Sequence, residues 1–215
     1  REDSTGGFVM IDNETAHENC MLQMPDYVPS DNVNNSAYED SRRFTLDGRT
    51  MKVENSYQLE HYHVNMACYL QIGKWLDYLK ECGVYDNTRI IIVADHGRCL
   101  GQFDDLQVSD ELDVEGYHPI LMVKDFDAKE FAASDEFMTN ADVPGLALAG
   151  LMDDPVNPFT GNPITDDAKK EGNLRITTAD HFDQNPGNTL DTTGGSWYTI
   201  TGENIFDKGM FLLSQ

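Results

Sequence analysis

The chain has 215 residues, of which 40% are hydrophobic and 10% aromatic, so it can form a packed core and is not a disordered chain. Its 38 acidic and 15 basic residues give a formal net charge of −23. A surface of this sign repels nucleic acid and anionic membranes, and we expect neither as a partner. It also repels phosphate and sulfate esters at long range. An anionic substrate would therefore need a local metal ion or a few well-placed cations.

The four cysteines are too sparse for a disulfide-rich scaffold, and no C-x-x-C pair indicates a structural zinc site. The sequence has no apolar run of about 18 residues and no signal-peptide pattern, so we expect no membrane segment in this chain. It begins with Arg1 instead of a methionine. We therefore expect it to be a piece of a longer protein.

Residues 8–11 are apolar and precede a polar stretch that contains His17. This pattern predicts a strand followed by a loop. Residues 23–55 are rich in Pro, Asn, Asp and Ser, which predicts a long surface excursion. Loops of this length inside a domain usually carry function or form a mobile lid.

Apolar residues recur every three or four positions in residues 57–82, which predicts a helix with one apolar stripe, and Gly83 is placed to end it. Residues 89–94 then predict a strand buried on both faces, and residues 119–123 predict a second strand. A helix that leads into such a strand is typical of a parallel sheet. The predicted fold class is therefore α/β, with a mostly parallel sheet flanked by helices.

Residues 142–151 predict a short helix that tolerates Pro144 in its first turn. Residues 197–200 and 205–206 predict a closing hairpin or edge strands. No internal repeat and no strong domain boundary is evident. We therefore expect a core of about residues 8–160 and a loop-rich C-terminal appendage of about residues 153–215.

Asp95 and His96 directly follow the predicted strand 89–94. In a parallel sheet the residues past this end of a strand face the ligand crevice. A carboxylate and an imidazole there suit a divalent metal ion or acid/base chemistry. The alternative is an aspartate that caps the next turn beside an exposed histidine. Gly97 allows close approach of the backbone, or simply forms a turn.

Arg98 could bind an anionic substrate with two hydrogen bonds, or pair with a nearby carboxylate. His17 would reach the same sheet edge as Asp95 if the first strand were parallel to strand 89–94, and is then a candidate substrate contact. Otherwise it is a solvated loop residue. His61 and His63 flank the apolar stripe of the predicted helix, so we expect a structural role for both.

Several common catalytic motifs are missing from the sequence: G-x-S-x-G, the P-loop, G-x-G-x-x-G and the EF-hand loop. An active site needs a nucleophile and more metal ligands than one Asp-His pair. Nothing else in the chain supplies them convincingly.

Three segments of the chain resemble the alkaline phosphatase superfamily. They are most similar to its sulfatase-like branch, which includes lipoteichoic acid synthases, phosphoglycerol transferases and phosphoethanolamine transferases. Residues 13–27 are similar to the loop with a substrate-facing histidine, and residues 62–79 to the helix before the metal strand. Residues 85–97 are similar to the metal signature, in which Asp-Asn-Thr, an apolar run and Asp-His-Gly follow one another. Residues 121–126 and 139–144 continue the resemblance.

The resemblance implies that Asp95 and His96 bind a divalent metal ion, which could be manganese, magnesium, zinc or calcium. It also implies that His17 contacts the phosphoryl or sulfuryl group of a phosphate- or sulfate-ester substrate, whose remainder could be a lipid or glycan. Members of this branch are usually anchored in the bacterial cell membrane with the catalytic domain outside the cytoplasm. We expect the same extracytoplasmic place for the parent of this chain.

The chain departs from the family because no nucleophile or further metal ligand precedes the His17 loop, and no C-x-P-x-R or S-x-P-x-R motif is present. The resemblance therefore implies that residues 1–215 are the C-terminal portion of a catalytic domain, truncated on its N-terminal side and inactive alone. Such a truncation would expose a strand edge and favour self-association. The alternative is a non-catalytic, acidic extracytoplasmic module for binding or assembly, which the upstream sequence would distinguish.

Overall fold

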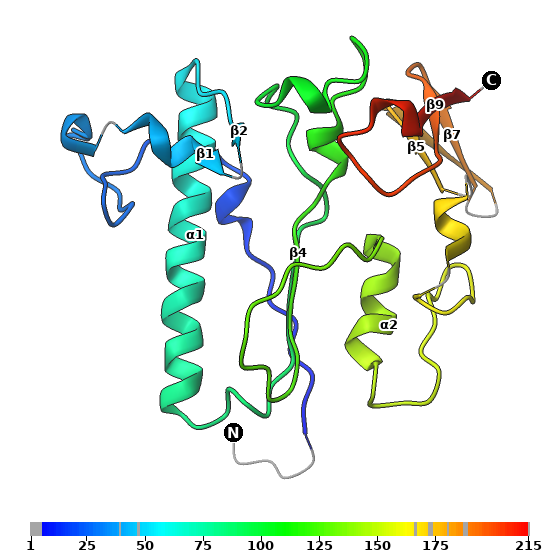
Figure 1. The fold of residues 1–215 in the computed structure, drawn as a ribbon, viewed down its shortest axis with the longest axis horizontal. Helices are drawn as coiled ribbons and strands as arrows, with labels where there is room; N and C mark the ends of the chain where they lie inside the picture. Colours follow the sequence, from blue (N-terminus) through cyan, green and yellow to red (C-terminus); the bar gives the residue numbers. More distant parts are fainter. Residues whose placement is uncertain are drawn as a thin grey trace. The chain divides into compact units, whose positions relative to one another are not determined.

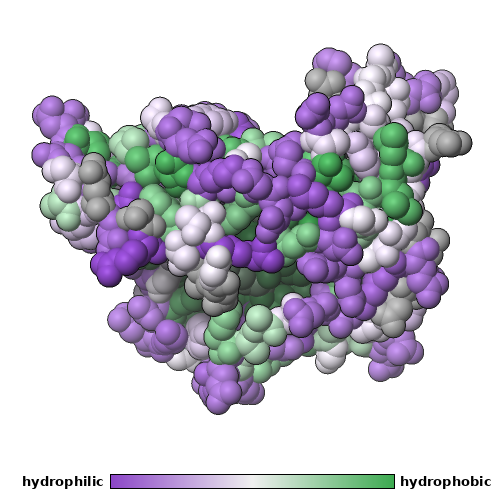
Figure 2. All heavy atoms as spheres, turned by 45° about the horizontal axis from the view of Figure 1, so that its top comes forward, coloured by the Kyte–Doolittle hydropathy of each residue, from purple (hydrophilic) through white to green (hydrophobic). Residues whose placement is uncertain are grey.

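The structure is a computed structural model that describes residues 6–214 except 39, 47, 166, 172–173, 180 and 187–188. The chain divides into two units, Arg1–Tyr85 and Asp86–Gln215, and each is described by itself. Figure 1 shows the elements of both. Among the residues that are described, none of the helices combines the length and the hydrophobicity that a membrane span requires. Hydrophilic side chains cover much of the face seen in Figure 2, as the composition predicts.

The first unit is built on helix α1 (Ser56–Glu81), drawn in cyan in Figure 1. Asn55 is the N-cap of this helix: its side chain accepts a hydrogen bond from the Gln58 amide at 3.0 Å. At its other end Gly83 adopts a φ of +69°, and the Val84 amide returns to the Leu79 carbonyl at 3.1 Å. The predicted helix and its glycine stop are thus confirmed.

Short elements make up the rest of the first unit. The predicted excursion at residues 23–55 contains a two-stranded hairpin, β1 (Thr45–Leu46) and β2 (Arg49–Thr50). The 3-10 helices are η1 (Glu14–Ala16), η2 (Ser36–Tyr38) and η3 (Ser41–Phe44). The strand predicted at residues 8–11 is wrong, because these residues join no ladder among the described residues. Their four side chains are 69% to 84% exposed.

The core of the first unit lies where Leu22 and Tyr27 pack against Val64 of α1. His63 lies beside them with no exposed surface. The Tyr27 ring packs edge-on against its imidazole, with 5.2 Å between the two ring centroids. The Leu22 amide donates to His63 Nδ1 at 3.1 Å, while His63 Nε2 is buried without a hydrogen-bond partner. The structural role expected for this histidine, and for the equally buried His61, is confirmed.

The second unit begins with β3 (Ile90–Val93) and β4 (Leu121–Lys124), which confirm the two predicted strands. The burial predicted for both faces of β3 is wrong, because only Ile90 is buried and Val93 is 40% exposed. They run antiparallel, with Ile90 opposite Lys124 and Val93 opposite Leu121. Between them lie only the short 3-10 helices η4 (Asp104–Leu106) and η5 (Val114–Tyr117). A parallel pair needs a long crossover, usually an α-helix, to bring the chain back to the starting edge. Here the chain turns back directly.

The remaining sheets of the second unit are also antiparallel. One has three strands in the order β5 (Leu174–Thr177), β8 (Trp197–Ile200) and β9 (Phe211–Ser214). The other is a ribbon of β6 (His181–Asn185) and β7 (Thr189–Thr193), so the tail forms a strand at 197–200 but none at 205–206. The predicted fold class, a mostly parallel α/β sheet flanked by helices, is therefore wrong. The described residues form short antiparallel sheets of two or three strands and two α-helices.

The main core of the second unit lies under the three-stranded sheet. Its buried residues come from the loop between β3 and β4 and from the C-terminal strands: Leu106, Leu112, Val114, Tyr198, Ile200, Met210 and Phe211. The segment expected to be a loop-rich appendage therefore supplies four of these seven core residues. The 3-10 helix η8 (Lys208–Met210) leads into β9 beside it.

Helix α2 (Val143–Leu148) is shorter than predicted and carries Pro144 in its first turn as expected. The Arg89 guanidinium lies at its C-terminal end and donates to the carbonyls of Leu146 and Ala147 at 3.3 and 3.2 Å. It also donates to the Asp125 carboxylate at 2.8 Å, directly after β4. Arg89 thus ties the start of β3 to α2, because a cation there satisfies carbonyls that the helix leaves unpaired.

The 3-10 helices η6 (Asn140–Asp142) and η7 (Asp167–Lys170) are joined through the Asp142 carboxylate, which is 2% exposed. It accepts hydrogen bonds from Asn157 Nδ2, Lys169 Nζ and the Thr139 amide at 2.8 to 2.9 Å. Burial alone would raise the pKa of Asp142, but the Lys169 ammonium and the hydrogen bonds hold it below its usual value. We refer to these four residues as the Asp142 clasp.

The first prediction concerns this clasp. Asp142→Ala should lower the free energy of unfolding by about 3 kcal/mol, because it leaves the half-buried Lys169 cation unpaired. Urea unfolding measures the change. The matched control is Asp86→Ala, whose partner Lys129 lies 2.9 Å away on the surface, and which should cost at most about 1 kcal/mol. Equal losses in both variants would contradict the structural role of the clasp.

The second prediction concerns His63 and pH. Burial, and then the nearby Arg43 guanidinium, lower the pKa of His63 below its usual value. Below about pH 6.5 the unfolded chain binds a proton that the folded one excludes, so stability should fall by at most about 1.4 kcal/mol per pH unit. Above that pH the contribution is fully present. Protonated Nδ1 also can no longer accept from the Leu22 amide.

Hydrogen exchange at the Leu22 amide, corrected for the intrinsic rate, measures this effect between pH 8 and pH 5. Protection should decrease as the pH falls. The variant His63→Gln keeps an acceptor but does not titrate, so its protection should stay nearly level. A parallel decrease in both proteins would show that another group is responsible.

Candidate functional site

The candidate site is at the end of β3, where three of the four predicted site residues follow one another closely. The last contact of the β3–β4 ladder is the hydrogen bond from the Ala94 amide to the Ile120 carbonyl at 3.1 Å. Asp95 and His96 come directly after it and are both exposed. The ladder therefore ends just where the polar pair begins.

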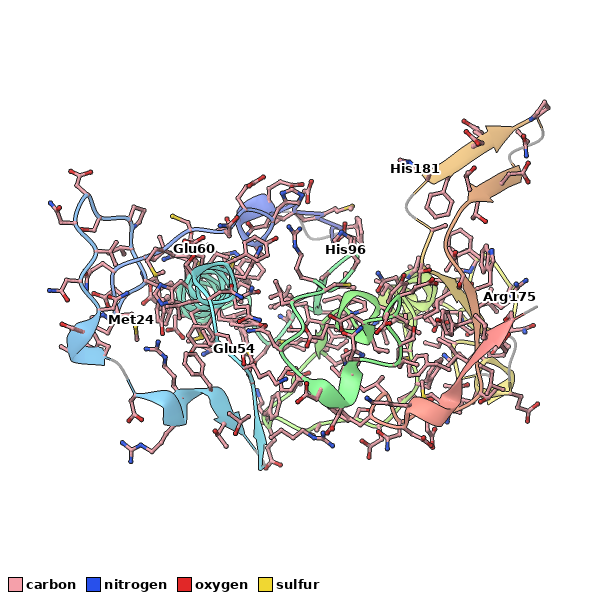
Figure 3. All side chains as sticks on the ribbon, turned by 90° about the horizontal axis from the view of Figure 1, so that it is seen from above. Met24, Glu54, Glu60, His96, Arg175 and His181 are labelled. Carbon is pink, nitrogen blue, oxygen red and sulfur yellow. The ribbon has the colours of Figure 1, made fainter. Side chains whose placement is uncertain are left out.

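The side chains of Asp95 and His96 turn toward each other. Asp95 Oδ2 and His96 Nε2 are 3.6 Å apart, with 88% and 60% of the two side chains exposed. Asp95 Oδ1 accepts a hydrogen bond from the His96 amide at 2.9 Å, which orients the carboxylate. His96, labelled in Figure 3, has its Nδ1 2.6 Å from the Gly97 carbonyl oxygen.

The contact with Gly97 decides which imidazole nitrogen is available. A carbonyl oxygen can only accept, so Nδ1 donates to it, and in the neutral imidazole Nε2 then keeps its lone pair. A backbone carbonyl bound to the other ring nitrogen is the usual way in which proteins orient a metal-binding histidine. His96 therefore presents Nε2 as a ligand atom on the side of the Asp95 carboxylate.

Gly97 lies directly against the segment that returns to β4. Its amide donates to the Gly116 carbonyl at 3.0 Å, and a Cβ on Gly97 would overlap the carbonyl of Glu115. A Cβ on Gly116 would likewise overlap the Cys99 sulfur. The glycine after Asp-His is therefore required by close backbone packing, and the simple turn that we considered does not explain it.

Glu115 holds the loop that follows the pair. Its carboxylate accepts hydrogen bonds from the backbone amides of Leu100 at 3.1 Å and of Gln102 and Phe103 at 2.7 Å each. Burial, and then the neighbouring Asp113 carboxylate, raise the pKa of Glu115, although its amide contacts oppose that shift. The carboxylate thus replaces the hydrogen bonds that this irregular loop cannot make to a sheet.

An open depression of about 330 Å³ lies next to the pair, with its walls formed by the close-packed loops. Its lining residues are His96, Gly97, Arg98, Cys99, Gly116 and Tyr117. Arg98 is exposed at its rim, and Tyr117 donates from its hydroxyl to the Thr177 carbonyl at 2.7 Å. Burial of the sulfur, and then the Asp113 carboxylate, raise the pKa of the Cys99 thiol, which disfavours its nucleophilic thiolate form.

The geometry of the pair fits a divalent metal ion. Two ligand atoms about 2.1 Å from one ion, at a tetrahedral angle, lie about 3.4 Å apart, close to the separation found between Asp95 Oδ2 and His96 Nε2. Within the part of the chain that the structure describes, no group of three or more His, Cys, Asp or Glu side chains could hold a metal. The pair would contribute two ligands, and water or other residues would have to supply the rest.

His17, the fourth predicted site residue, belongs to the first unit and is described there. It ends η1, is exposed, and places its Nδ1 3.0 Å from the Glu18 carboxylate. Two residues further along, the Asn19 side chain donates to the carboxylate of Glu60 in α1, which Figure 3 labels. The structure therefore brings together Asp95, His96 and Arg98, and it places His17 in the other unit.

Sequence reasoning missed two residues that shape the site, Glu115 and Asn140. The Asn140 side chain donates to the carbonyls of Ala94 and Asp95 at 3.0 and 2.7 Å. Neither residue stands out among many acidic and amide side chains, since their partners are backbone groups distant in sequence.

Comparisons with protein-family models, with curated proteins and with solved structures give no match for this chain.

The third prediction tests the close packing at the site. Gly97→Ala should lower the free energy of unfolding by about 2 kcal/mol or more, because the added Cβ meets a backbone carbonyl that cannot rotate away. Gly73→Ala in α1 is the matched control, as its Cβ would meet nothing within 4 Å. That variant should gain about 0.5 to 1 kcal/mol. A neutral Gly97→Ala would contradict the packing described here.

Proposed function

We propose that this chain carries part of the active site of a metal-dependent hydrolase or transferase acting on phosphate or sulfate esters. One observation carries the proposal: the Asp95 carboxylate and His96 Nε2 lie 3.6 Å apart and exposed, with Nδ1 held by the Gly97 carbonyl. The Asp-His-Gly signature in residues 85–97 supports the same function. The proposal depends on this local geometry, and no longer on a parallel sheet.

Each residue has a definite role in this proposal. Asp95 and His96 hold the metal ion, which when bound stabilises negative charge on the substrate and activates a nucleophile. A carboxylate paired with an imidazole suits manganese or zinc, while magnesium and calcium favour oxygen ligands. Arg98, beside the depression, binds the anionic ester group and offsets the repulsion from the acidic surface. The substrate contact of His17, which belongs to the first unit, follows from the resemblance alone.

The wider biological setting follows from the resemblance alone and belongs to the same proposal. The substrate is a phosphate or sulfate ester that includes a lipid or glycan. The parent protein is anchored in a bacterial cell membrane and acts outside the cytoplasm. No residue within the 215-residue chain is assigned as the nucleophile, so we expect this chain to be inactive by itself.

The fourth prediction tests the metal pair in the longer protein. Asp95→Asn and His96→Gln should each reduce manganese-dependent hydrolysis of a p-nitrophenyl phosphate mono- or diester by at least about 100-fold, because either change removes a metal ligand. Asp110→Asn removes the same charge from an exposed position of the second unit and should leave activity unchanged. Full activity in either ligand variant would refute the metal assignment.

The isolated chain provides the complementary measurement. It should show no turnover of either substrate in the presence of manganese, because no residue within it is assigned as the nucleophile. Turnover that depends on Asp95 would show instead that the nucleophile lies within residues 1–215.

A further inference from the structure

We propose that Asn140 is a positioning residue, which holds the backbone turn that makes Asp95 and His96 face one another. The inference rests on the proposed function, since it concerns the same metal pair. It begins with the two hydrogen bonds from Asn140 Nδ2 to the carbonyls of Ala94 and Asp95, at 3.0 and 2.7 Å. Because carbonyls only accept, the amide nitrogen, and not its oxygen, must face them.

The turn at this point is a geometric requirement. In a strand, successive side chains point to opposite faces, so Asp95 and His96 would diverge if β3 continued. Successive carbonyls also alternate in direction along a strand. Here the carbonyls of Ala94 and Asp95 converge on a single nitrogen, which is possible only because the backbone has left the strand geometry. The same departure brings Asp95 Oδ2 to 3.6 Å from His96 Nε2.

Asn140 is held firmly enough to impose this geometry. It opens η6, whose Thr139 and Asp142 form a reciprocal capping box. Asp142 is the buried centre of the Asp142 clasp: its Oδ1 accepts from Asn157 Nδ2, and its Oδ2 accepts from Lys169 Nζ as well as from Thr139. The donor therefore stands on a fixed base, and the strand end is the part that must adapt to it.

Loss of this donor has a direct consequence for the pair. Without Nδ2 the two carbonyls have no common partner, and the chain after Ala94 can return toward extended backbone. Asp95 Oδ2 and His96 Nε2 would then separate, and each would bind a metal ion alone. We expect manganese affinity to fall about 10-fold, as is typical when a group that orients metal ligands is removed.

The test uses the full 215-residue chain, labelled with ¹⁵N, and follows Mn²⁺-induced line broadening at the Asp95 and His96 amides. Asn140→Ala and Asn140→Asp should each need about 10-fold more Mn²⁺ for the same broadening. The second variant is the more decisive, because its added negative charge alone would strengthen cation binding. Asn204→Asp makes the same charge change at an exposed position of the second unit and is the matched control.

A second readout does not depend on metal. At pH 8 the ¹⁵N shifts of the His96 ring should show the Nδ1–H form in the wild type and a mixture of both tautomers in the Asn140 variants. A residue that merely stabilised the fold would leave the tautomer unchanged. Wild-type ring shifts and wild-type Mn²⁺ broadening in both folded variants would overturn the positioning role. Absence of broadening at Asp95 and His96 in the wild type would instead overturn the proposed function, while the ring shifts still decide the role of Asn140.

Discussion

Close contact between two backbone segments is the constraint on which the candidate site depends. Gly97, just after Asp95 and His96, lies against Glu115 and Gly116, just before the chain returns to β4. Only glycine permits this approach at position 97, because a Cβ there would overlap the backbone carbonyl of Glu115. The contact brings the Glu115 carboxylate within reach of the amides that follow Arg98, and so orders a loop without regular structure.

The same contact explains why the sheet differs from the expected one. A short apolar strand such as β3 forms equally well in a parallel or an antiparallel pair, since its isoleucine and valine side chains carry no information about the direction of the neighbouring strand. Direction depends on the connection. The loop after β3 folds back on itself where Gly97 contacts Gly116. The strand β4 therefore begins next to the end of β3 and runs antiparallel to it, with no crossover helix.

The pair itself could be predicted from local order alone, because Asp95 and His96 follow directly after a strand whose end is visible in the sequence. Their supporting groups could not. Asn140 lies 45 residues from the Asp95 carbonyl that it binds, and Glu115 lies 15 residues from the Leu100 amide. Side chains that bond to backbone leave no pattern of complementary residue types, so only the folded chain identifies them.

The sequence by itself determined the elements whose causes are local. Helix α1 follows from its apolar period and its glycine stop, and β3 from its β-branched run, because these features act within a few residues. The tertiary structure decided strand direction, the exposure of residues 8–11 and the burial of His63 against Leu22. These depend on which distant segments meet, and that is set by the packing and hydrogen bonding of the whole unit, which no local pattern records.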